Sequence, residues 1–177
     1  TILSTGFSPV RAATVAPAGS GTSASPFLIS NLQDLQWLQE YLANAANDGG
    51  YDKHFRQTAD IALGTIADWT PLGQSASGFR GTYDGQGYVI SHLKIDLSGT
   101  SPKYDRGLFA VNNGTIVGLG VTDVVITGGS TEEQRSGALA GSNKGTIQRC
   151  WATGSIATAA LATGGLVGQM TTGAGAV

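Results

Sequence analysis

Apolar side chains recur at helical spacing in one stretch of the chain, residues 30 to about 47. They stand three or four positions apart, at Leu32, Leu35, Leu38, Tyr41, Leu42 and Ala45. This spacing places them on one face of an α-helix. Ser30 followed by Gln33 fits a capping box, and Asp48-Gly49-Gly50 supplies a stop. The pattern predicts one helix over about 30–47.

Beyond residue 57 the apolar pattern changes to the alternation that is typical of β-strands. The clearest alternating stretches are residues 58–63, 88–95 and 121–126, and glycine-centred turns follow at 84–87, 113–114 and 144–145. Because the turns are so closely spaced, the rest of the chain is predicted to consist of short strands that change direction repeatedly.

The chain also contains an internal repeat. Residues 107–116 align without gaps to residues 138–147, which lie 31 positions later, and a third copy opens at Gly165, 27 positions after Ala138. Repeats of about thirty residues have too few apolar side chains to bury alone, so they stack and share one core. Coils spaced about 4.8 Å apart would pair every strand with its neighbours in the coils above and below.

Stacking makes specific predictions about equivalent residues. Leu108, Leu139 and Leu166 should form one inward ladder, and Ile116 and Ile147 should form another. Asn112 and Asn143 should stack and hydrogen-bond at a corner. The fold class is therefore predicted to be all-β, a right-handed parallel β-helix (β-solenoid) with one N-terminal capping α-helix that protects the open end of the stack.

Composition agrees with a folded chain and excludes several classes of protein. The chain has 27 glycines in 177 residues, 41% hydrophobic residues and 12% charged residues, with no Gly-X-Y period. A net charge of −2 with ten scattered Lys and Arg residues offers no basic stripe, so we expect no nucleic-acid partner. No apolar run reaches about 18 residues, so we expect no membrane insertion.

A family resemblance joins these features. The segments 107–110 (GLFA), 138–141 (ALAG) and 165–168 (GLVG), the first two followed by Gly-Thr-Ile, resemble the GLUG repeat of bacterial surface proteins. Residues 19–29, the helix, and residues 54–63, 69–73 and 79–88 resemble the entry module that often precedes such repeats. The resemblance covers about residues 19–168. It departs from the repeat pattern at Ala110, Ala138 and Met170.

The resemblance implies a secreted or cell-surface bacterial protein with a non-catalytic role in display or adhesion. Its partners would be a carbohydrate or a host or cell-surface protein. The alternative is the non-catalytic repeat region of a larger secreted peptidase or carbohydrate-active enzyme. A polysaccharide lyase or hydrolase is a third, less favoured hypothesis, because it needs acidic residues of successive coils to converge with an Arg or Lys.

The domain organisation is expected to be simple. Residues 1–18 would be a leader, either flexible or the tail of a signal peptide with Val10 and Ala12 at a cleavage spacing. Residues 19–177 would form a single β-solenoid domain, with GLUG-like repeats from about 107. The natural protein is expected to continue beyond residue 177, because a repeat has only just begun there.

No catalytic, cofactor-binding or metal-binding residue is assigned, and neither an enzyme activity nor a cofactor is expected. The aspartates that lie beside glycines or at strand ends are expected to accept turn amides: Asp60, Asp68, Asp84, Asp96, Asp105 and Asp123. His54 and His92 lack a clustered partner, and Glu132, Glu133 and Arg135 indicate a solvated loop. No calcium-binding sequence is present.

Aromatic and sulfur-containing side chains complete the set of candidates. The aromatic residues that could stack on sugar rings are Trp37, Trp69, Tyr83, Tyr88, Tyr104 and Trp151. Trp37 and Trp151 are expected to pack in the core instead. Cys150 is expected to be a small buried hydrophobe in a strand that ends at Trp151. Ice binding would need a regular array of threonines, and the pair Thr115 and Thr146 is too small for one.

Overall fold

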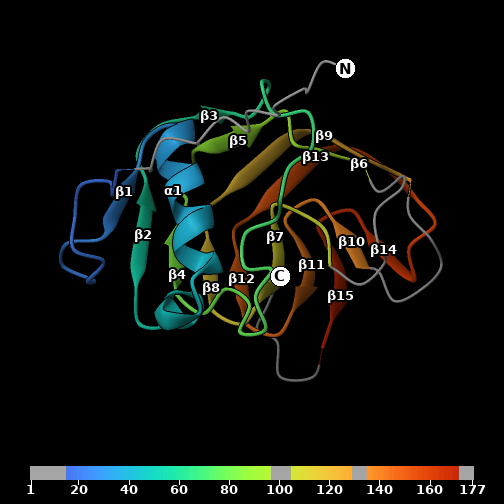
Figure 1. Ribbon diagram of the computed structural model, residues 1–177. Coiled ribbons are helices and arrows are strands. Elements are labelled where there is room, and N and C mark those ends of the chain that lie inside the picture. Colours follow the sequence, from blue (N-terminus) through green and yellow to red (C-terminus); the bar gives the residue numbers. More distant parts are fainter. Residues whose placement is uncertain (1–14, 97–104, 129–134, 172–177) are drawn as a thin grey trace, which may run out of the picture.

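The computed structural model describes residues 15–96, 105–128 and 135–171. Within these residues, strands predominate, the paired strands run parallel, and one α-helix lies near the start of the chain (Figure 1). The described part of the chain is therefore all-β with parallel sheets and a single α-helix. Residues 1–14 of the predicted leader lie outside the described residues. Its last residue, Ala18, accepts a hydrogen bond from Leu28 N at 2.8 Å.

The first sheet has five strands in the order β1-β2-β4-β8-β12. Their bounds are Phe27–Ile29 (β1), His54–Gln57 (β2), Thr82–Asp84 (β4), Thr115–Val117 (β8) and Thr146–Gln148 (β12). Phe55, Tyr83, Ile116 and Ile147 stand in register and point into the core, where each is buried. The Ile116–Ile147 ladder predicted from the repeat is confirmed.

The second sheet follows the first along the chain and has the strand order β13-β9-β5-β3. Its strands are Ile61–Ala62 (β3), Val89–Ser91 (β5), Gly120–Gly128 (β9) and Trp151–Thr158 (β13); β6, Lys94–Asp96, also pairs with β9. β9 carries one extra residue relative to β13, because Val121 pairs with Ala152 whereas Val124 pairs with Gly154. Asp123, at φ 52°, lies within this bulge.

Two smaller sheets contain the remaining strands. One contains β7 (Phe109–Asn112), β11 (Ala140–Asn143) and β15 (Val167–Met170); the other contains β10 (Arg135–Gly137) and β14 (Ala162–Gly164). Two successive stretches of chain, β8 to β11 and β12 to β15, visit the four sheets in the same order. Equivalent strands of successive repeats are therefore hydrogen-bonded neighbours.

The register matches the repeat found in the sequence. Phe109 pairs with Ala140, 31 positions later, and Ala140 pairs with Val167, 27 positions later. Leu139 donates its backbone N–H to the Leu166 carbonyl at 2.9 Å. Leu108 and Leu139 are fully buried, whereas Leu166 is only partly buried. The leucine ladder is thus present, but its last member is open to solvent.

The stacked asparagines are also confirmed. Asn112 and Asn143 are paired in register and fully buried, and Asn112 Nδ2 donates to Asn143 Oδ1 at 2.7 Å. Each side chain also accepts the backbone N–H two residues later, at Gly114 and Gly145. These bonds hold the corner between the third and first sheets in the same form in two successive repeats.

Two of the alternating stretches are shorter as strands than the sequence predicts. In 58–63 only Ile61–Ala62 is a strand. The stretch 88–95 divides into β5 and β6 because His92 adopts a left-handed conformation at φ 62°. The stretch 121–126 lies wholly within β9, as predicted.

The α-helix, α1, spans Leu32–Ala43, and a 3₁₀ helix spans Ala45–Gly50. The predicted range of about 30–47 is therefore too long at both ends, and Ser30 is not the N-cap. Asn31 caps the helix by accepting Asp34 N at 3.0 Å, and the Asp34 carboxylate accepts the Ser30 N–H and hydroxyl in return. The α-helix already ends at Ala43, where Asn44 is the extended C-cap, so the predicted stop at Asp48-Gly49-Gly50 lies too late; these three residues are left-handed and end the 3₁₀ segment instead.

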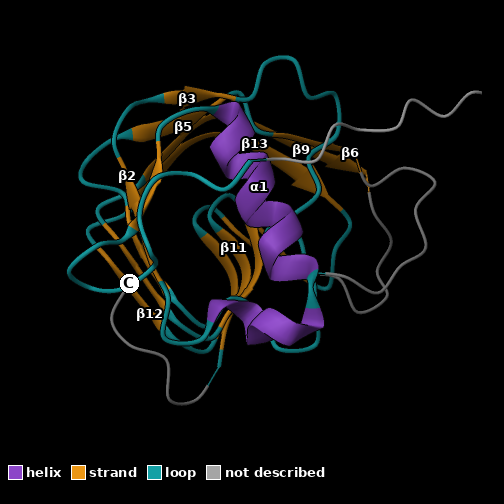
Figure 2. Cartoon of the chain, turned by 60° about the vertical axis from the view of Figure 1, so that its left-hand side comes forward, coloured by secondary structure: helices purple, strands orange, loops and turns teal. Residues whose placement is uncertain are grey.

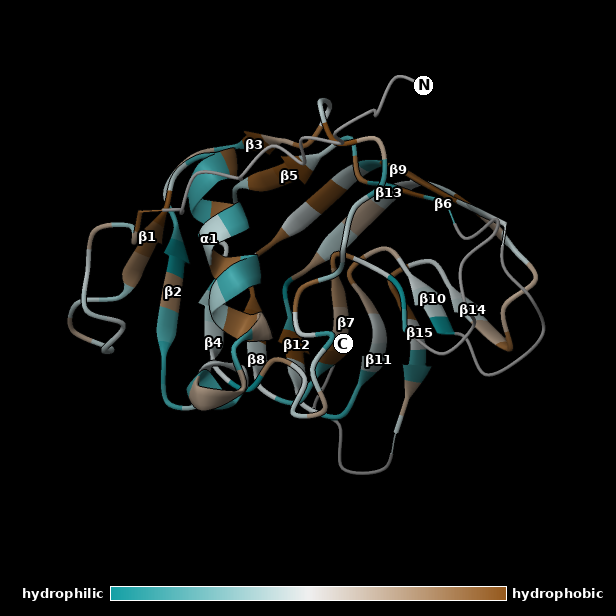
Figure 3. Ribbon diagram, in the orientation of Figure 1, coloured by the Kyte–Doolittle hydropathy of each residue, from teal (hydrophilic) through white to brown (hydrophobic). Residues whose placement is uncertain are grey.

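The buried face of α1 consists of Leu35, Leu38 and Leu42. Figure 2 shows the helix lying across the front of the strand layers, and Figure 3 shows bands of hydrophobic and hydrophilic residues along it. Beside it, Phe27 contacts the rings of Trp37 and Phe55, with centroids 4.9 and 5.8 Å away. The helix therefore covers the end of the shared core near β1 and β2.

Candidate functional site

Three of the candidate carboxylates accept hydrogen bonds from backbone amides. Asp60 Oδ1 accepts Val89 N at 2.8 Å, Asp68 Oδ1 accepts Asp96 N at 3.1 Å, and Asp84 Oδ1 accepts Gln86 N at 3.1 Å. The first two of these bonds join one repeat to the next, and the third closes the predicted Asp-Gly turn. Their expected structural role is confirmed.

The remaining acidic candidates do not meet in one place. Asp105 pairs with Arg135 at 3.2 Å, and Asp123 Oδ2 lies 4.0 Å from His92 Nε2. Arg135 therefore bridges two repeats rather than belonging to a solvated loop, which corrects that prediction. Glu132 and Glu133 lie outside the described residues.

No metal centre or membrane span is found in the described part of the chain. Across residues 15–96, 105–128 and 135–171, no three His, Cys, Asp or Glu side chains gather to hold a metal ion. In those same residues, no helix combines the length and apolar character needed to cross a membrane.

The aromatic candidates divide into buried and exposed side chains. Tyr83 is fully buried with its hydroxyl donating to Gln57 Oε1 at 3.0 Å, and Trp69 is 2% exposed with Nε1 donating to Leu108 O. Trp37 packs between Phe27 and Tyr41, as predicted. Because they are buried, the rings of Tyr83 and Trp69 are not accessible to a ligand.

Trp151 does not pack in the core, so that prediction is wrong. Its side chain is 47% exposed, and its indole lies over Gly120, where a Cβ atom would stand 2.7 Å from the ring. Tyr88 is also exposed, and Tyr104 lies outside the described residues. Trp151 begins β13 rather than ending a strand. It pairs with Gly120, whereas the next residue, Ala152, pairs with the fully buried Val121, so the Trp151 side chain lies on the outer face of the sheet.

Cys150 precedes β13 and is half-buried. Its Sγ lies 3.3 Å from the Gln148 carbonyl and 3.8 Å from the Ile116 carbonyl. Burial raises the pKa of the thiol, which favours the neutral, weakly nucleophilic form. Cys150 therefore has the properties of a packed side chain.

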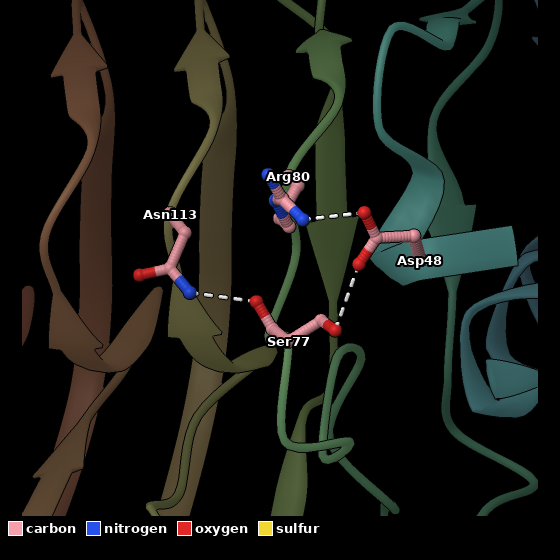
Figure 4. A network of polar contacts seen from close by, with 4 residues as sticks. All are labelled: Asp48, Ser77, Arg80 and Asn113. Atoms are coloured by element: carbon pink, nitrogen blue, oxygen red, sulfur yellow. Dashed lines mark hydrogen bonds and ion pairs between the residues drawn. The ribbon is translucent and has the colours of Figure 1, made fainter.

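A polar network that the sequence did not indicate joins three repeats (Figure 4). The Asp48 carboxylate accepts the Ser77 hydroxyl at 2.9 Å and the Arg80 guanidinium, while Asn113 Nδ2 donates to the Ser77 carbonyl at 2.6 Å. Arg80 also lies over the Tyr51 ring, 4.6 Å from its centroid. The Ser77 hydroxyl, and after it Arg80, lowers the pKa of Asp48. The network fastens the 3₁₀ helix to the loop before β4 and to the corner after β7.

A regular polar surface lies on the outer face of the five-stranded sheet. His54, Thr82, Thr115 and Thr146 form one column in register, and all four are partly exposed. Beside it runs the second column, which contains Leu28, Arg56, Asp84, Val117 and Gln148. The sequence indicated only the Thr115–Thr146 pair, because Thr82 lies outside the recognisable repeat. We call this surface the threonine face.

The comparisons concern parts of larger proteins. No family model matches the chain. It is 30% identical over 160 residues to halomucin of Haloquadratum walsbyi, a match that covers 86% of this chain and 2% of halomucin. It is 35% identical over 136 residues to a candidate Gly-rich membrane protein of Evansella cellulosilytica, covering 73% of this chain and 14% of that protein. The chain thus spans a small part of both relatives.

One solved structure has a similar fold. It is the crystal structure of a candidate immunoglobulin A1 protease from Bacteroides ovatus. The two chains superpose with a TM-score of 0.53 and 19% identity, over 88% of this chain and 65% of that one. At this identity the similarity concerns the fold.

Proposed function

We propose that residues 19–177 form a right-handed parallel β-solenoid with GLUG-like repeats, capped at its N-terminal end by α1. The module serves in display or adhesion outside a bacterial cell and has no catalytic role. Its partner is a glycan, a matrix component or another surface protein. The threonine face makes the contact.

The observation that carries this proposal is the threonine face itself. It presents the same hydroxyl-bearing side chain in three neighbouring strands, at a spacing of about 4.8 Å. Hydroxyl groups both donate and accept hydrogen bonds, so such a column suits a polar, repetitive partner such as a glycan chain. The carboxylates of Asp60, Asp68 and Asp84 accept backbone amides of the fold. The name of the halomucin relative is compatible with a surface role.

The test is a glycan and extracellular-matrix array probed with the chain, with a triple test variant and with a double control variant. The test variant is Thr82→Val, Thr115→Val and Thr146→Val, which keeps side-chain shape and strand propensity but removes the hydroxyl groups. The control is Thr122→Val with Thr127→Val, on the second sheet. We expect binding that the test variant loses and the control keeps. Binding that survives in the test variant would exclude the threonine face.

A second candidate function is supported by the fold comparison. The similar solved structure is described as a candidate immunoglobulin A1 protease, so this module can also belong to the non-catalytic part of a larger secreted peptidase. A carbohydrate-active enzyme is the other possible host. An assay for release of reducing or unsaturated sugars, run beside the array, tests the chain for turnover. Turnover by the chain alone would contradict both functions.

A further inference from the structure

The third sheet is interrupted where the repeat before β7 would contribute a strand. Leu72 and Phe79 pair with Phe109 and Asn112, the first and last residues of β7, through isolated bridges. The two residues are seven positions apart in the earlier repeat and three apart in β7, so four extra residues lie between the bridges. We call residues 73–78 the inserted loop. Insertions in stacked repeats form loops on one face, which is often the binding face.

The inserted loop is closed at its base and anchored beside α1. Gly73 and Gly78 flank it with φ values of 68° and 63°, and a Cβ atom on either would lie 2.7 or 2.9 Å from its nearest neighbouring atom. Gly78 N donates to Ser75 O at 3.0 Å, and the Ser77 hydroxyl donates to Asp48 (Figure 4). The loop is therefore tied to the 3₁₀ helix that follows α1.

A cavity of about 250 Å³ lies between the inserted loop and α1. Among the described residues, those that line it are all uncharged. They include two residues of α1, two that precede the loop and two of the loop itself: Gln39, Ala43, Thr70, Pro71, Gln74 and Ser75. Pockets for drug-sized ligands measure about 300–1,000 Å³. This cavity is slightly smaller, and its size suits a group such as one sugar residue.

The cavity is bordered by a hydroxyl group that the fold does not satisfy. The Ser75 hydroxyl is shielded from solvent and has no hydrogen-bond partner in the described part of the chain. An unpaired hydroxyl in such a place destabilises the fold. Rotation about its Cα–Cβ bond redirects the hydroxyl, so a ligand in the cavity removes this cost by pairing with it. On the opposite side, Gln39 Nε2 donates to the Thr70 carbonyl and joins the helix to the segment before the loop.

We propose that this cavity binds one uncharged sugar residue. Gln39, Thr70 and Gln74 carry amide or hydroxyl groups, which donate and accept hydrogen bonds as sugar hydroxyls do. Ala43 and Pro71 offer apolar surface to the C–H groups of the ring. A charged sugar loses hydration in the cavity without meeting an opposite charge in the lining. The site goes beyond the proposed function, because it uses no residue of the threonine face.

Free sugars are the probes. Methyl glucoside, methyl galactoside and N-acetylglucosamine are titrated into the chain while NMR follows the backbone amides of residues 73–75 and the side-chain amides of Gln39 and Gln74. Glucuronate, and glucosamine with its amine protonated, are the charged controls. We expect saturable shifts at these amides with at least one uncharged sugar. Both charged sugars should bind at least about tenfold more weakly.

Two leucine variants locate the site. Ala43→Leu places a bulky side chain in the cavity and should weaken sugar binding by at least about tenfold. Ala46→Leu is the matched control, because Ala46 is equally an exposed alanine but does not line the cavity, and it should leave the affinity unchanged. Thermal unfolding checks that both variants fold.

The variant Ser75→Ala separates binding from a structural role. It should weaken sugar binding by about three- to tenfold, because one hydrogen bond to the ligand is lost. It should not lower the melting temperature, since the hydroxyl has no partner within the described residues. A serine with a purely structural role would give the reverse result.

The outcomes distinguish this proposal from the threonine face. The triple threonine variant should bind the sugar like the parent chain, and Ala43→Leu should keep any binding on the array that the threonine face provides. Absence of saturable shifts with every uncharged sugar, equal weakening by the two leucine variants, or equally tight binding of the charged sugars would overturn the proposal.

Discussion

Replacement of Asn112 by alanine tests the stacked asparagines, and we expect it to lower the free energy of unfolding by about 2–6 kcal/mol. The fully buried side chain donates to Asn143 Oδ1 at 2.7 Å and accepts Gly114 N at 3.1 Å. Alanine leaves the Gly114 amide without this acceptor and removes one donor from Asn143. A buried polar group that loses its partner costs about 1–3 kcal/mol, and two groups are affected.

The assay is urea unfolding followed by circular dichroism, with Asn113→Ala as the matched control. The exposed Asn113 side chain donates to Ser77 O, so its loss should cost about 1 kcal/mol or less. The double variant of Asn112 and Asn143 should lose less than the sum of the single variants, by about 0.5–3 kcal/mol, because the side chains are in contact. A loss below about 1 kcal/mol for Asn112→Ala, or strict additivity, would refute the reasoning.

Three further predictions concern other contacts of the stack. Gly145→Ala should lower the melting temperature because its Cβ would lie 2.1 Å from the Gly114 carbonyl oxygen, whereas Gly165→Ala, with nothing within 4 Å, should leave it unchanged. Tyr83→Phe should cost about 1–3 kcal/mol by removing the bond to Gln57. Because burial raises the pKa of Tyr83, the parent chain should lose stability as pH rises above the ordinary tyrosine value, and unfolding titrations should find a smaller loss in the variant, in which Tyr41 and Cys150 still have raised pKa values. The third variant is Asp48→Asn. Because the pKa of Asp48 is lowered in the folded chain, the carboxylate stabilises the fold above the ordinary carboxyl range, and this contribution is lost as pH falls through the folded-state pKa. The difference in unfolding free energy between parent and variant should therefore shrink on acidification.

The repeat was the part of the fold most accessible from sequence. The spacing of 31 positions between Asn112 and Asn143 is the spacing of their register in the structure. This works because a parallel stack places equivalent residues side by side, so sequence identity at a fixed offset is also spatial contact. The threonine face was only half visible, since Thr82 belongs to a repeat whose sequence has diverged around a tyrosine.

The errors have a common cause: a local sequence pattern does not show which face of a strand is buried or at which residue a helix begins. Alternation in β13 shows that its residues point to opposite sides, but only the pairing of Trp151 with Gly120 shows which side faces solvent. At the helix start, Ser30 and Asn31 are both good capping residues. The Asp34 carboxylate decides between them by binding Ser30, which leaves Asn31 to accept the Asp34 amide.

The unusual composition follows from the stacking. Gly114 and Gly145 occupy the same corner in successive repeats, and a Cβ atom on either would lie 2.2 or 2.1 Å from a carbonyl oxygen of the repeat before it. Each new repeat therefore requires a glycine at this corner, which accounts for part of the 27 in the chain. Ion pairs add to the contacts between repeats at two places, where Arg135 pairs with Asp105 and Arg80 pairs with Asp48.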